Sequence, residues 1–230
     1  AAEQVAVFDQ MSGGRLILGV GRGYAPEMLR AFHVPVAAHR RTFAWTLDSM
    51  RRAWAGGAVT LDNEPENSIK LFPRPAKQPD PPIWVAAFGP KALAQAGGLG
   101  LPYLSSPMES LGTLRENYSK HQAAAVAAGV SPPEILPLMR TVFVSRDAGQ
   151  CQRLRETLTA QADNSRLQDG EDIDDWTIIG EPSFVRERVQ EYQQSLGMTH
   201  MIATRIRLGG LEEPMLRASV AVLAETLAGV

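Results

Sequence analysis

An arginine between two glycines, Gly21-Arg22-Gly23, is the group of residues best suited to bind an anion in this sequence. It follows the apolar run Arg15–Val20, so the guanidinium would stand at the carboxyl end of a strand. The glycines allow the backbone to approach a ligand closely. A phosphate needs a cation and backbone N–H groups that point toward it. We therefore expect a phosphate contact at Arg22, and the alternative is a surface arginine in a turn.

A second candidate anion site is the turn from a later apolar run into a helix. Helix N-termini carry partial positive charge and N–H groups without intrahelical partners. A lysine in the first turn would add a full charge. The alternative for the glycine is a simple turn at the helix entry. The candidate residues are Ala87, Phe88, Gly89, Lys91 and Ala92.

Two serines, Ser105 and Ser106, follow the next apolar segment. Their hydroxyl groups could bind polar atoms of a ligand at the end of a strand. A turn or capping role ahead of Pro107 explains them equally well. Both interpretations stay open on the sequence alone.

The other reactive residue types lack the spacing that their chemistry requires. Four histidines are dispersed without the spacing of metal ligands: His33, His39, His121 and His200. The single cysteine, Cys151, excludes a disulfide framework and a Cys-rich zinc site, and we expect an inert thiol. The acidic stretch at 169–175 does not fit a calcium-binding EF-hand. We predict no metal site. The sequence contains no nucleophile elbow, P-loop or Gly-x-Gly-x-x-Gly motif.

The charge balance argues against partners that are held mainly by electrostatics. The 230 residues include 23 Lys and Arg and 25 Asp and Glu, for a net charge of −2. This excludes a strongly basic surface for nucleic acid or an anionic membrane. The apolar runs are short, and residues 1–11 have no signal-peptide pattern. We expect a cytoplasmic protein that acts on a small molecule.

Strand and helix patterns alternate along the chain, which is typical of an α/β fold with a parallel sheet. A proline-rich excursion is expected at 58–82 and an exposed loop at 165–182. The expected strands are 15–20, 83–87, 103–106, 139–144 and 201–206. The expected helices are 1–11, 38–55, 91–96, 109–128, 147–162, 184–196 and 212–227. The pattern fits an open doubly wound sheet and part of a barrel equally well.

The segment Asp9–Gly23 resembles the best-marked segment of the luciferase-like flavin monooxygenase family, which includes bacterial luciferase and deazaflavin-dependent reductases. Three further segments agree with that family in order and spacing. Pro81–Pro90 resembles the strand before the cofactor loop, and Gly100–Ser105 resembles the next strand. Ile179–Pro182 resembles a late turn ahead of a helix. Together the four segments span nearly the whole chain.

The resemblance implies a (β/α)8 TIM barrel in which residues 1–230, as a single domain, cover about strands 4–8. The N-terminal strands would then be missing, which agrees with a first helix that lacks an N-cap residue. The strands at 15–20 and 201–206 would be exposed edges, and unpaired edges favour association. We therefore expect a homo-oligomer, or another chain segment that covers these edges.

The resemblance also implies a flavin-dependent oxidoreductase that acts on a small organic substrate, with FMN or the deazaflavin coenzyme F420 as cofactor. Arg22 matches the family arginine that contacts the cofactor phosphate. Phe88, Gly89 and Ala92 stand where bacterial luciferase has acidic and hydroxyl residues, so this departure leaves the choice of cofactor open. The family's catalytic side chains come from early strands, and we name no catalytic residue here. The alternatives are a non-catalytic flavin-binding or structural barrel remnant, and a phosphate-binding barrel lyase or isomerase.

Overall fold

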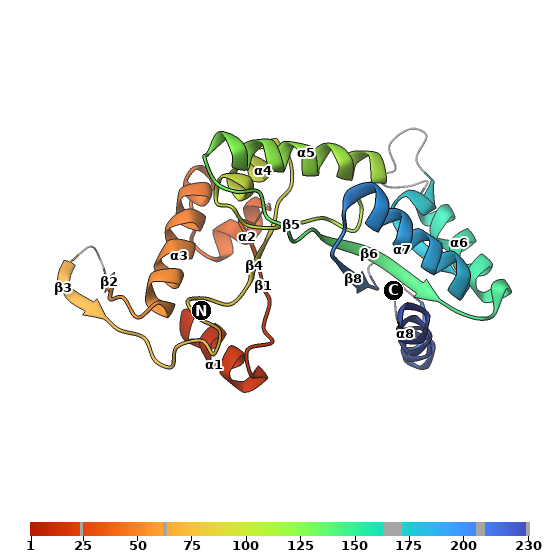
Figure 1. Ribbon diagram of the computed structural model, residues 1–230, viewed down its shortest axis with the longest axis horizontal. Coiled ribbons are helices and arrows are strands. Elements are labelled where there is room, and N and C mark those ends of the chain that lie inside the picture. The colour runs from red at the N-terminus through yellow and green to blue at the C-terminus, as the bar shows by residue number, and fades with distance from the viewer. Residues whose placement is uncertain (24, 62–63, 163–171, 206–209, 229–230) are drawn as a thin grey trace. The chain divides into compact units, whose positions relative to one another are not determined.

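The computed structural model describes residues 1–23, 25–61, 64–162, 172–205 and 210–228 (Figure 1). The chain divides into two compact units, Ala1–Ala86 and Ala87–Val230. We describe each unit by itself, and the single domain expected over 1–230 stays a prediction.

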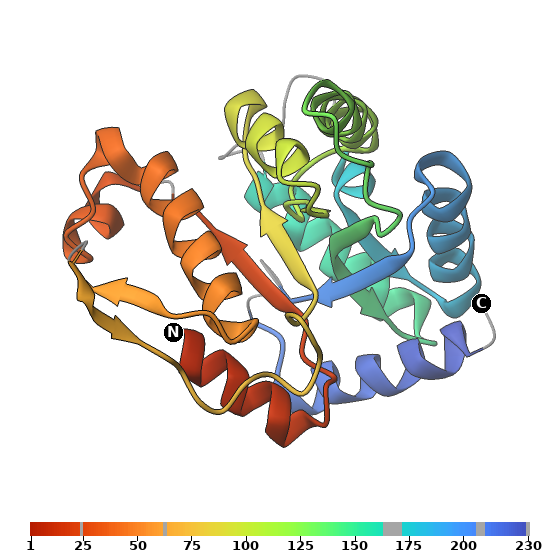
Figure 2. The same ribbon diagram turned by 60° about the vertical axis from the view of Figure 1, so that its left-hand side comes forward.

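The first unit contains two parallel strands that follow the helix α1 (Ala2–Ser12) and the proline-rich segment. Strand β1 (Leu18–Gly21) pairs with β4 (Ile83–Ala86), with Leu18 opposite Ile83 and Gly21 opposite Ala86. Figure 2 shows the two arrows side by side. Ile83, Trp84 and Val85 of β4 are buried, as the apolar run predicts.

Strand β1 is an edge strand within the described residues, as expected for this segment. Its apolar residues are not fully buried, because the strand alternates between half-buried and exposed positions. An apolar sequence shows which side chains a strand can bury, but the elements packed against the strand determine which of them are buried. The strand is also shorter than predicted, since residues 15–17 lie outside it.

Three further helical segments complete the helices of the first unit: α2 (Pro26–Ala31), η1 (Val36–Ala38) and α3 (His39–Trp54). Helix α3 contacts α1 and buries Leu47 and Trp54. The indole Nε1 of Trp54 donates a hydrogen bond to the carbonyl oxygen of Ala2 at 3.0 Å. The helix therefore lies close to its predicted range, and its apolar face packs as helical spacing requires.

The expected irregular excursion at 58–82 contains more regular structure than predicted. Strands β2 (Val59–Leu61) and β3 (Glu64–Ile69) form an antiparallel hairpin. The remainder up to Pro82 has no helix or strand. It is held to α1 by the N–H of Lys77, which donates to the buried Asp9 carboxylate at 2.8 Å. The side chain of Gln10 also donates to the carbonyl oxygen of Arg74 at 2.8 Å.

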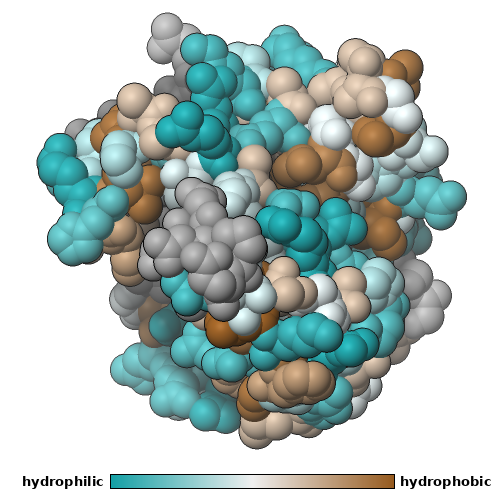
Figure 3. All heavy atoms as spheres, turned by 90° about the vertical axis from the view of Figure 1, so that its left-hand side faces the viewer, coloured by the Kyte–Doolittle hydropathy of each residue, from teal (hydrophilic) through white to brown (hydrophobic). Residues whose placement is uncertain are grey.

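Large apolar side chains are exposed at several positions of the first unit. The space-filling view shows hydrophobic groups scattered between hydrophilic ones on the face turned to the viewer (Figure 3). The described large apolar residues of this unit that are more than half exposed are Phe8, Met11, Phe32, Trp45 and Phe72.

The second unit is built around β6 (Pro137–Val144), which has a parallel strand on each side. Strand β7 (Thr177–Gly180) pairs with its later half and β8 (His200–Thr204) with its earlier half. Helix α8 (Glu213–Leu227) contacts β6 and α7 (Figure 1). The other elements are α4 (Pro90–Gly98), β5 (Tyr103–Leu104), α5 (Leu111–Ala127), α6 (Ala148–Ala162), η2 (Ile173–Asp175) and α7 (Pro182–Leu196).

The strand β7 includes Ile179 and Gly180, which the sequence analysis assigned to the turn Ile179–Pro182. All four of its residues are buried, and three of them, Thr177, Ile178 and Ile179, are β-branched. With β7, the described residues contain six strands outside the hairpin instead of the five expected. The correspondence to barrel strands 4–8 relied on five, and the described residues form no closed barrel. It therefore stays a prediction. Strand β8 is an edge strand, as expected, and residue 206 of its predicted range lies outside the described residues.

The prediction of an exposed loop at 165–182 is wrong for the residues of this range that the structure describes. Residues 165–171 lie outside the described part, and residues 172–175 form a turn with reciprocal capping between Asp172 and Asp175. Ile173 is 3% exposed and packs into the core together with Trp176. The prediction missed this because the segment is rich in Asp and Glu, and the burial of the single apolar residue Ile173 does not show in its composition.

The sequence predicts no membrane span, and no helix in the part of the chain that is described is long and apolar enough to cross a bilayer.

Candidate functional site

The segment Gly21-Arg22-Gly23 leaves β1 and turns sharply toward α2. Gly23 has a φ of +70°, in the left-handed region that favours glycine. A Cβ on Gly23 would lie 3.2 Å from the Cδ2 atom of Leu29. The second glycine is therefore required by the local turn, whether or not a ligand is bound.

Arg22 is half-buried and lies in a positive environment within the first unit. Burial, followed by the charge of Arg40, lowers the pKa of the Arg22 guanidinium. Arg40 belongs to the first turn of α3 and was not among the predicted site residues. The positive charges of Arg22 and Arg40 repel each other, and an anion bound at Arg22 would oppose that repulsion.

The two predicted anion-binding segments follow the paired strands β1 and β4 in the sequence. Gly21 is the last residue of β1 and Ala86 the last of β4, and they are opposite each other. A Cβ on Gly21 would be only 3.6 Å from the Cβ of Ala86. Arg22 and Ala87 are the residues that follow in the sequence, so both segments start at the carboxyl ends of paired parallel strands.

In the second unit, residues 87–92 form the entry to α4. Gly89 is the N-cap residue with a φ of +79°, and no atom lies within 4 Å of a Cβ placed on it. The N–H groups of Ala92 and Leu93 donate to its carbonyl oxygen, at 3.0 Å and 3.1 Å. Pro90 has no N–H to offer. An anion here would use the N–H groups of Gly89 and Lys91.

The side chains of this entry differ strongly in exposure. Phe88 is 79% exposed and Lys91 is exposed, whereas Ala87 and Ala92 are buried. The lysine side chain is therefore accessible to a ligand, and the two alanines can contribute only their backbone. The helix N-terminus offers fewer donors than the sequence led us to expect.

Ser105 and Ser106 both have partners within the second unit. Ser105 is 2% exposed, and its Oγ accepts from the N–H of Met139 at 3.2 Å. The half-buried Ser106 uses its Oγ to accept from the N–H of Met108 at 3.3 Å. The local turn role that the sequence left open is thus present for Ser106, whereas the Ser105 hydroxyl bonds to β6.

A buried carboxylate next to these serines was missed by the sequence analysis. Glu109 is 6% exposed, and both of its carboxylate oxygens accept from the Tyr103 hydroxyl, at 2.6 Å and 2.7 Å. The N–H of Ser106 donates to it at 2.6 Å and the amide of Asn117 at 2.7 Å. Burial raises the pKa of Glu109, and these hydrogen bonds partly oppose that shift.

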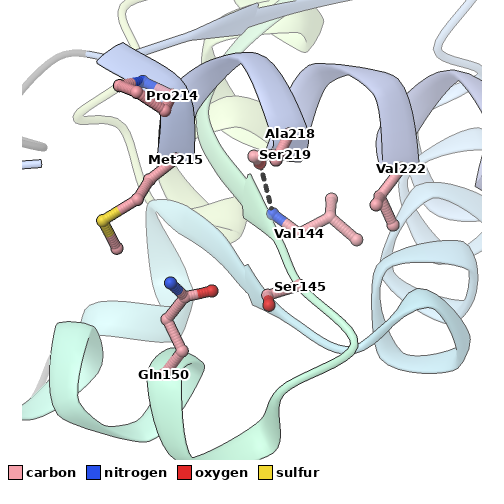
Figure 4. Close-up of a pocket in the computed structure, with 8 residues that line it drawn as sticks. All are labelled: Val144, Ser145, Gln150, Pro214, Met215, Ala218, Ser219 and Val222. Carbon is pink, nitrogen blue, oxygen red and sulfur yellow. Dashed lines mark hydrogen bonds between the residues drawn. The ribbon is translucent and has the colours of Figure 1, made fainter. Parts of the chain in front are cut away.

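A cavity of about 280 Å³ lies at the carboxyl end of β6 in the second unit (Figure 4). Its walls are mostly apolar, with Ser145, Gln150 and Ser219 as polar residues. The Ser219 hydroxyl accepts from the N–H of Val144 at 2.8 Å, which fixes α8 to β6 on one side of the cavity. None of the predicted site residues lines it. The lining residues are Val144, Ser145, Gln150, Pro214, Met215, Ala218, Ser219 and Val222.

The described residues contain no cluster of three or more side chains that could hold a metal ion. Cys151 is buried in the core, and burial raises the pKa of its thiol. A thiol with a raised pKa is a poor nucleophile at neutral pH, in agreement with the inert role predicted for it.

Known proteins share both sequence and structure with this chain. The F420-dependent glucose-6-phosphate dehydrogenase of Beutenbergia cavernae is 26% identical over 228 residues, which cover 87% of this chain and 66% of that protein. The alignments with two further curated relatives span only 30% and 46% of their lengths, so this chain spans less than half of each.

Solved structures of other proteins have a similar fold. The monooxygenase RslO1 from Streptomyces bottropensis has a TM-score of 0.77 at 22% identity, covering 99% of this chain and 72% of that one. The oxygenating constituent of 3,6-diketocamphane monooxygenase from Pseudomonas putida, in complex with FMN, has a TM-score of 0.75 at 16% identity. This second match covers 99% of this chain and 74% of that one. These likenesses confirm the α/β class of the fold.

The family model for luciferase-like monooxygenases matches residues 1–200, which is most of the chain and includes all four segments that carry the resemblance. The chain therefore belongs to the luciferase-like monooxygenase family.

Proposed function

We propose that this chain is the cofactor-binding part of a flavin-dependent oxidoreductase, with FMN as cofactor and the deazaflavin coenzyme F420 as the alternative. One similar structure holds FMN, and one relative is named as F420-dependent. The observation that carries the proposal is the pairing of Gly21 with Ala86, which starts both anion-binding segments at the same end of β1 and β4.

The residues present fit a phosphate group. Burial and, after it, the charge of Arg40 lower the pKa of the Arg22 guanidinium. A phosphate placed against Arg22 would oppose the repulsion from Arg40, and charge-assisted hydrogen bonds to a guanidinium are stronger than neutral ones. At the entry to α4, the N–H groups of Gly89 and Lys91 and the exposed Lys91 ammonium add further donors.

When bound, the cofactor supplies the redox chemistry, either activation of dioxygen by reduced flavin or transfer of a hydride by the deazaflavin. The part of this chain is to bind and orient it. Arg22 in the first unit is a candidate phosphate contact. In the second unit, Lys91 is another, Gly89 leaves space for an anion, and Ser106 offers a hydroxyl after β5. We assign no catalytic residue.

The buried carboxylate disfavours the lyase or isomerase alternative. A reaction of that kind needs a free carboxylate or lysine at a strand end to move a proton. Glu109 stands near the end of β5, but Tyr103, Ser106 and Asn117 already occupy it as donors. It is thus a structural acceptor, and the oxidoreductase stays the better proposal.

The proposal includes the finer features that the resemblance implies. The strands would be the later strands of a (β/α)8 barrel, and the protein would be a cytoplasmic homo-oligomer that acts on a small organic substrate. The support for association is that β1 and β8 are edge strands within the described residues. The net charge of −2 supports the absence of a nucleic-acid or membrane partner.

The experiment that tests the function is a titration of the purified protein with FMN and with F420, followed by a turnover assay with reduced coenzyme. We expect quenching of the fluorescence of one coenzyme and consumption of oxygen or of reduced coenzyme in the presence of substrate candidates. Binding without turnover would support a non-catalytic flavin-binding protein. Failure to bind either coenzyme would overturn the proposal.

A further inference from the structure

The chain that follows β5 is held from one side by the carboxylate of Glu109. The N–H of Ser106 donates to Oε2 of Glu109 at 2.6 Å, which closes a turn over residues 106–109. The Tyr103 hydroxyl and the Asn117 amide hold the same carboxylate from β5 and α5. The carboxylate thus connects the turn to the two elements on either side of it.

The same turn is held from the other side by Arg140, a fully buried residue in the middle of β6. Its Nη2 donates to the carbonyl oxygen of Glu109 at 2.6 Å, and its Nη1 donates to that of Ser106 at 3.4 Å and of Met139 at 3.0 Å. Its Nε donates to the Tyr192 hydroxyl at 3.0 Å, and the guanidinium lies 5.0 Å from the centre of that ring.

A buried arginine is a costly residue for a strand that otherwise packs apolar side chains. Taking a guanidinium out of water is unfavourable unless its donors are satisfied, and replacement of buried ionic groups by apolar ones is often neutral or stabilising. Stability of β6 alone therefore gives no reason for Arg140. What its guanidinium adds is a set of bonds to the backbone of Ser106 and Glu109, which no apolar side chain could make.

Burial of the Glu109 carboxylate is likewise unfavourable unless its hydrogen bonds are made. Its carboxylate accepts from the N–H of Ser106, and Arg140 donates to the carbonyl oxygens of both Ser106 and Glu109, so the two side chains act on the same turn. The Ser106 backbone is bonded at both its N–H and its carbonyl oxygen, the first by Glu109 and the second by Arg140. Because both the N–H and the carbonyl oxygen of Ser106 are bonded, its backbone has little freedom to rotate, and the direction of its side chain is restricted.

We infer that Arg140 is a positioning residue that acts with Glu109 to hold the turn 106–109 in one geometry, and thereby fixes Ser106 at the end of β5 for contact with the cofactor. The part that concerns the cofactor rests on the proposed function. The part that concerns the turn stands on the hydrogen bonds alone. Arg140 touches no cofactor in this scheme and acts only through the backbone of the turn.

The test uses the full chain and three variants. Arg140→Lys keeps the charge but loses the planar set of donors. Glu109→Gln keeps the shape of the side chain but places an amide where the carboxylate accepts. Tyr192→Phe removes the acceptor of Arg140 Nε together with a longer bond from Arg188, and is the milder variant if the first two fail to fold. The matched control is Arg155→Lys, which alters the Arg155–Asp174 ion pair in the same unit, away from the turn.

Two readouts separate positioning from mere stability. Hydrogen exchange of peptides that contain Ser106 is expected to become about tenfold faster in Arg140→Lys and Glu109→Gln, and the FMN dissociation constant about tenfold larger. The control is expected to lower the melting temperature without either effect. Tyr192→Phe should change both readouts in the same direction by a smaller factor.

Unchanged exchange at Ser106 in the folded variants would overturn the positioning of the turn. Faster exchange with an unchanged dissociation constant would overturn the link to the cofactor. If the wild-type chain binds neither FMN nor F420, the proposed function fails, and the exchange measurement still decides whether Arg140 and Glu109 hold the turn.

Discussion

The α-carbon of Gly97 in α4 faces the carbonyl oxygen of His121 in α5, so closely that a Cβ on Gly97 would lie 2.4 Å from that oxygen. The same Cβ would lie 2.9 Å from the Cβ of Ala124. Two helices can approach this closely only where one of them lacks a side chain. The pair α4 and α5 therefore packs backbone against backbone at this point.

Gly97→Ala is expected to destabilise the protein. The added methyl group must push α4 away from α5, and overpacking of a buried contact costs about 1–3 kcal/mol. Chemical denaturation measures the loss in the free energy of unfolding. The matched control is Gly112→Ala in α5, where a Cβ meets no atom within 4 Å, and helix propensity should stabilise by up to about 1 kcal/mol. Equal effects of the two substitutions would contradict the close approach.

Ser219→Ala is expected to weaken the attachment of α8 to β6. It leaves the buried N–H of Val144 without its acceptor, and an unsatisfied buried donor costs about 1–3 kcal/mol. Thermal unfolding should show a clear drop in melting temperature. Ser183→Ala, at an exposed position of α7, serves as the control and should have little effect. A drop no larger than that of the control would argue against the bond.

The protein is expected to lose stability when the pH falls below the ordinary pKa of histidine, because His121 is buried in its neutral form. Its Nε2 is 2.9 Å from the carbonyl oxygen of Leu101, and burial lowers its pKa from 6.5. The unfolded chain then binds a proton at higher pH than the folded one. The contribution of neutral His121 is present above pH 6.5 and is lost as the pH falls toward the folded pKa.

The measurement is the melting temperature between pH 7.5 and pH 5 for the wild type and for His121→Gln, whose amide can still donate to Leu101 but does not titrate. The wild type should lose more than the variant over this interval. Parallel curves for the two proteins would show that His121 does not cause the dependence.

Much of the fold follows from local patterns, and the failures have a common cause. The buried strand β4 and the amphipathic helix α3 were predicted because their apolar residues recur at the right spacing. Strand β7 was missed because it is short and runs directly into Gly180-Glu181-Pro182, a sequence that is typical of a turn. Only its place beside β6 makes it a strand, and residue order along the chain does not show which strand will lie alongside.

The site shows the same limit. Arg22 stood out because flanking glycines at the end of an apolar run are a local signal. Arg40 did not, because its effect on Arg22 arises from folding of α3 against the rest of the first unit. Arg140 was missed because its bond to the Glu109 carbonyl oxygen joins positions that are 31 residues apart. Glu109 was missed because the sequence does not show that its carboxylate is buried. An arginine inside an apolar strand, at Arg140, was the one available signal.

Arg22→Gln is expected to weaken FMN binding. Loss of a charge-assisted hydrogen bond to the phosphate costs about 1.5–3 kcal/mol, roughly tenfold to hundredfold in the dissociation constant. Fluorescence titration measures it. The control is Arg30→Gln, an exposed arginine of the same unit that pairs with Glu27 and should leave affinity unchanged. An equal loss in both variants would point to a general effect of charge.

The most direct test of the phosphate site compares FMN with riboflavin, which differs only by the phosphate, in the wild type and in Arg22→Gln. We expect the wild type to bind FMN at least about tenfold more tightly than riboflavin, and this preference to shrink in the variant, whose riboflavin affinity stays unchanged. A wild type that binds both flavins equally, or a preference that survives the loss of Arg22, would contradict the assignment.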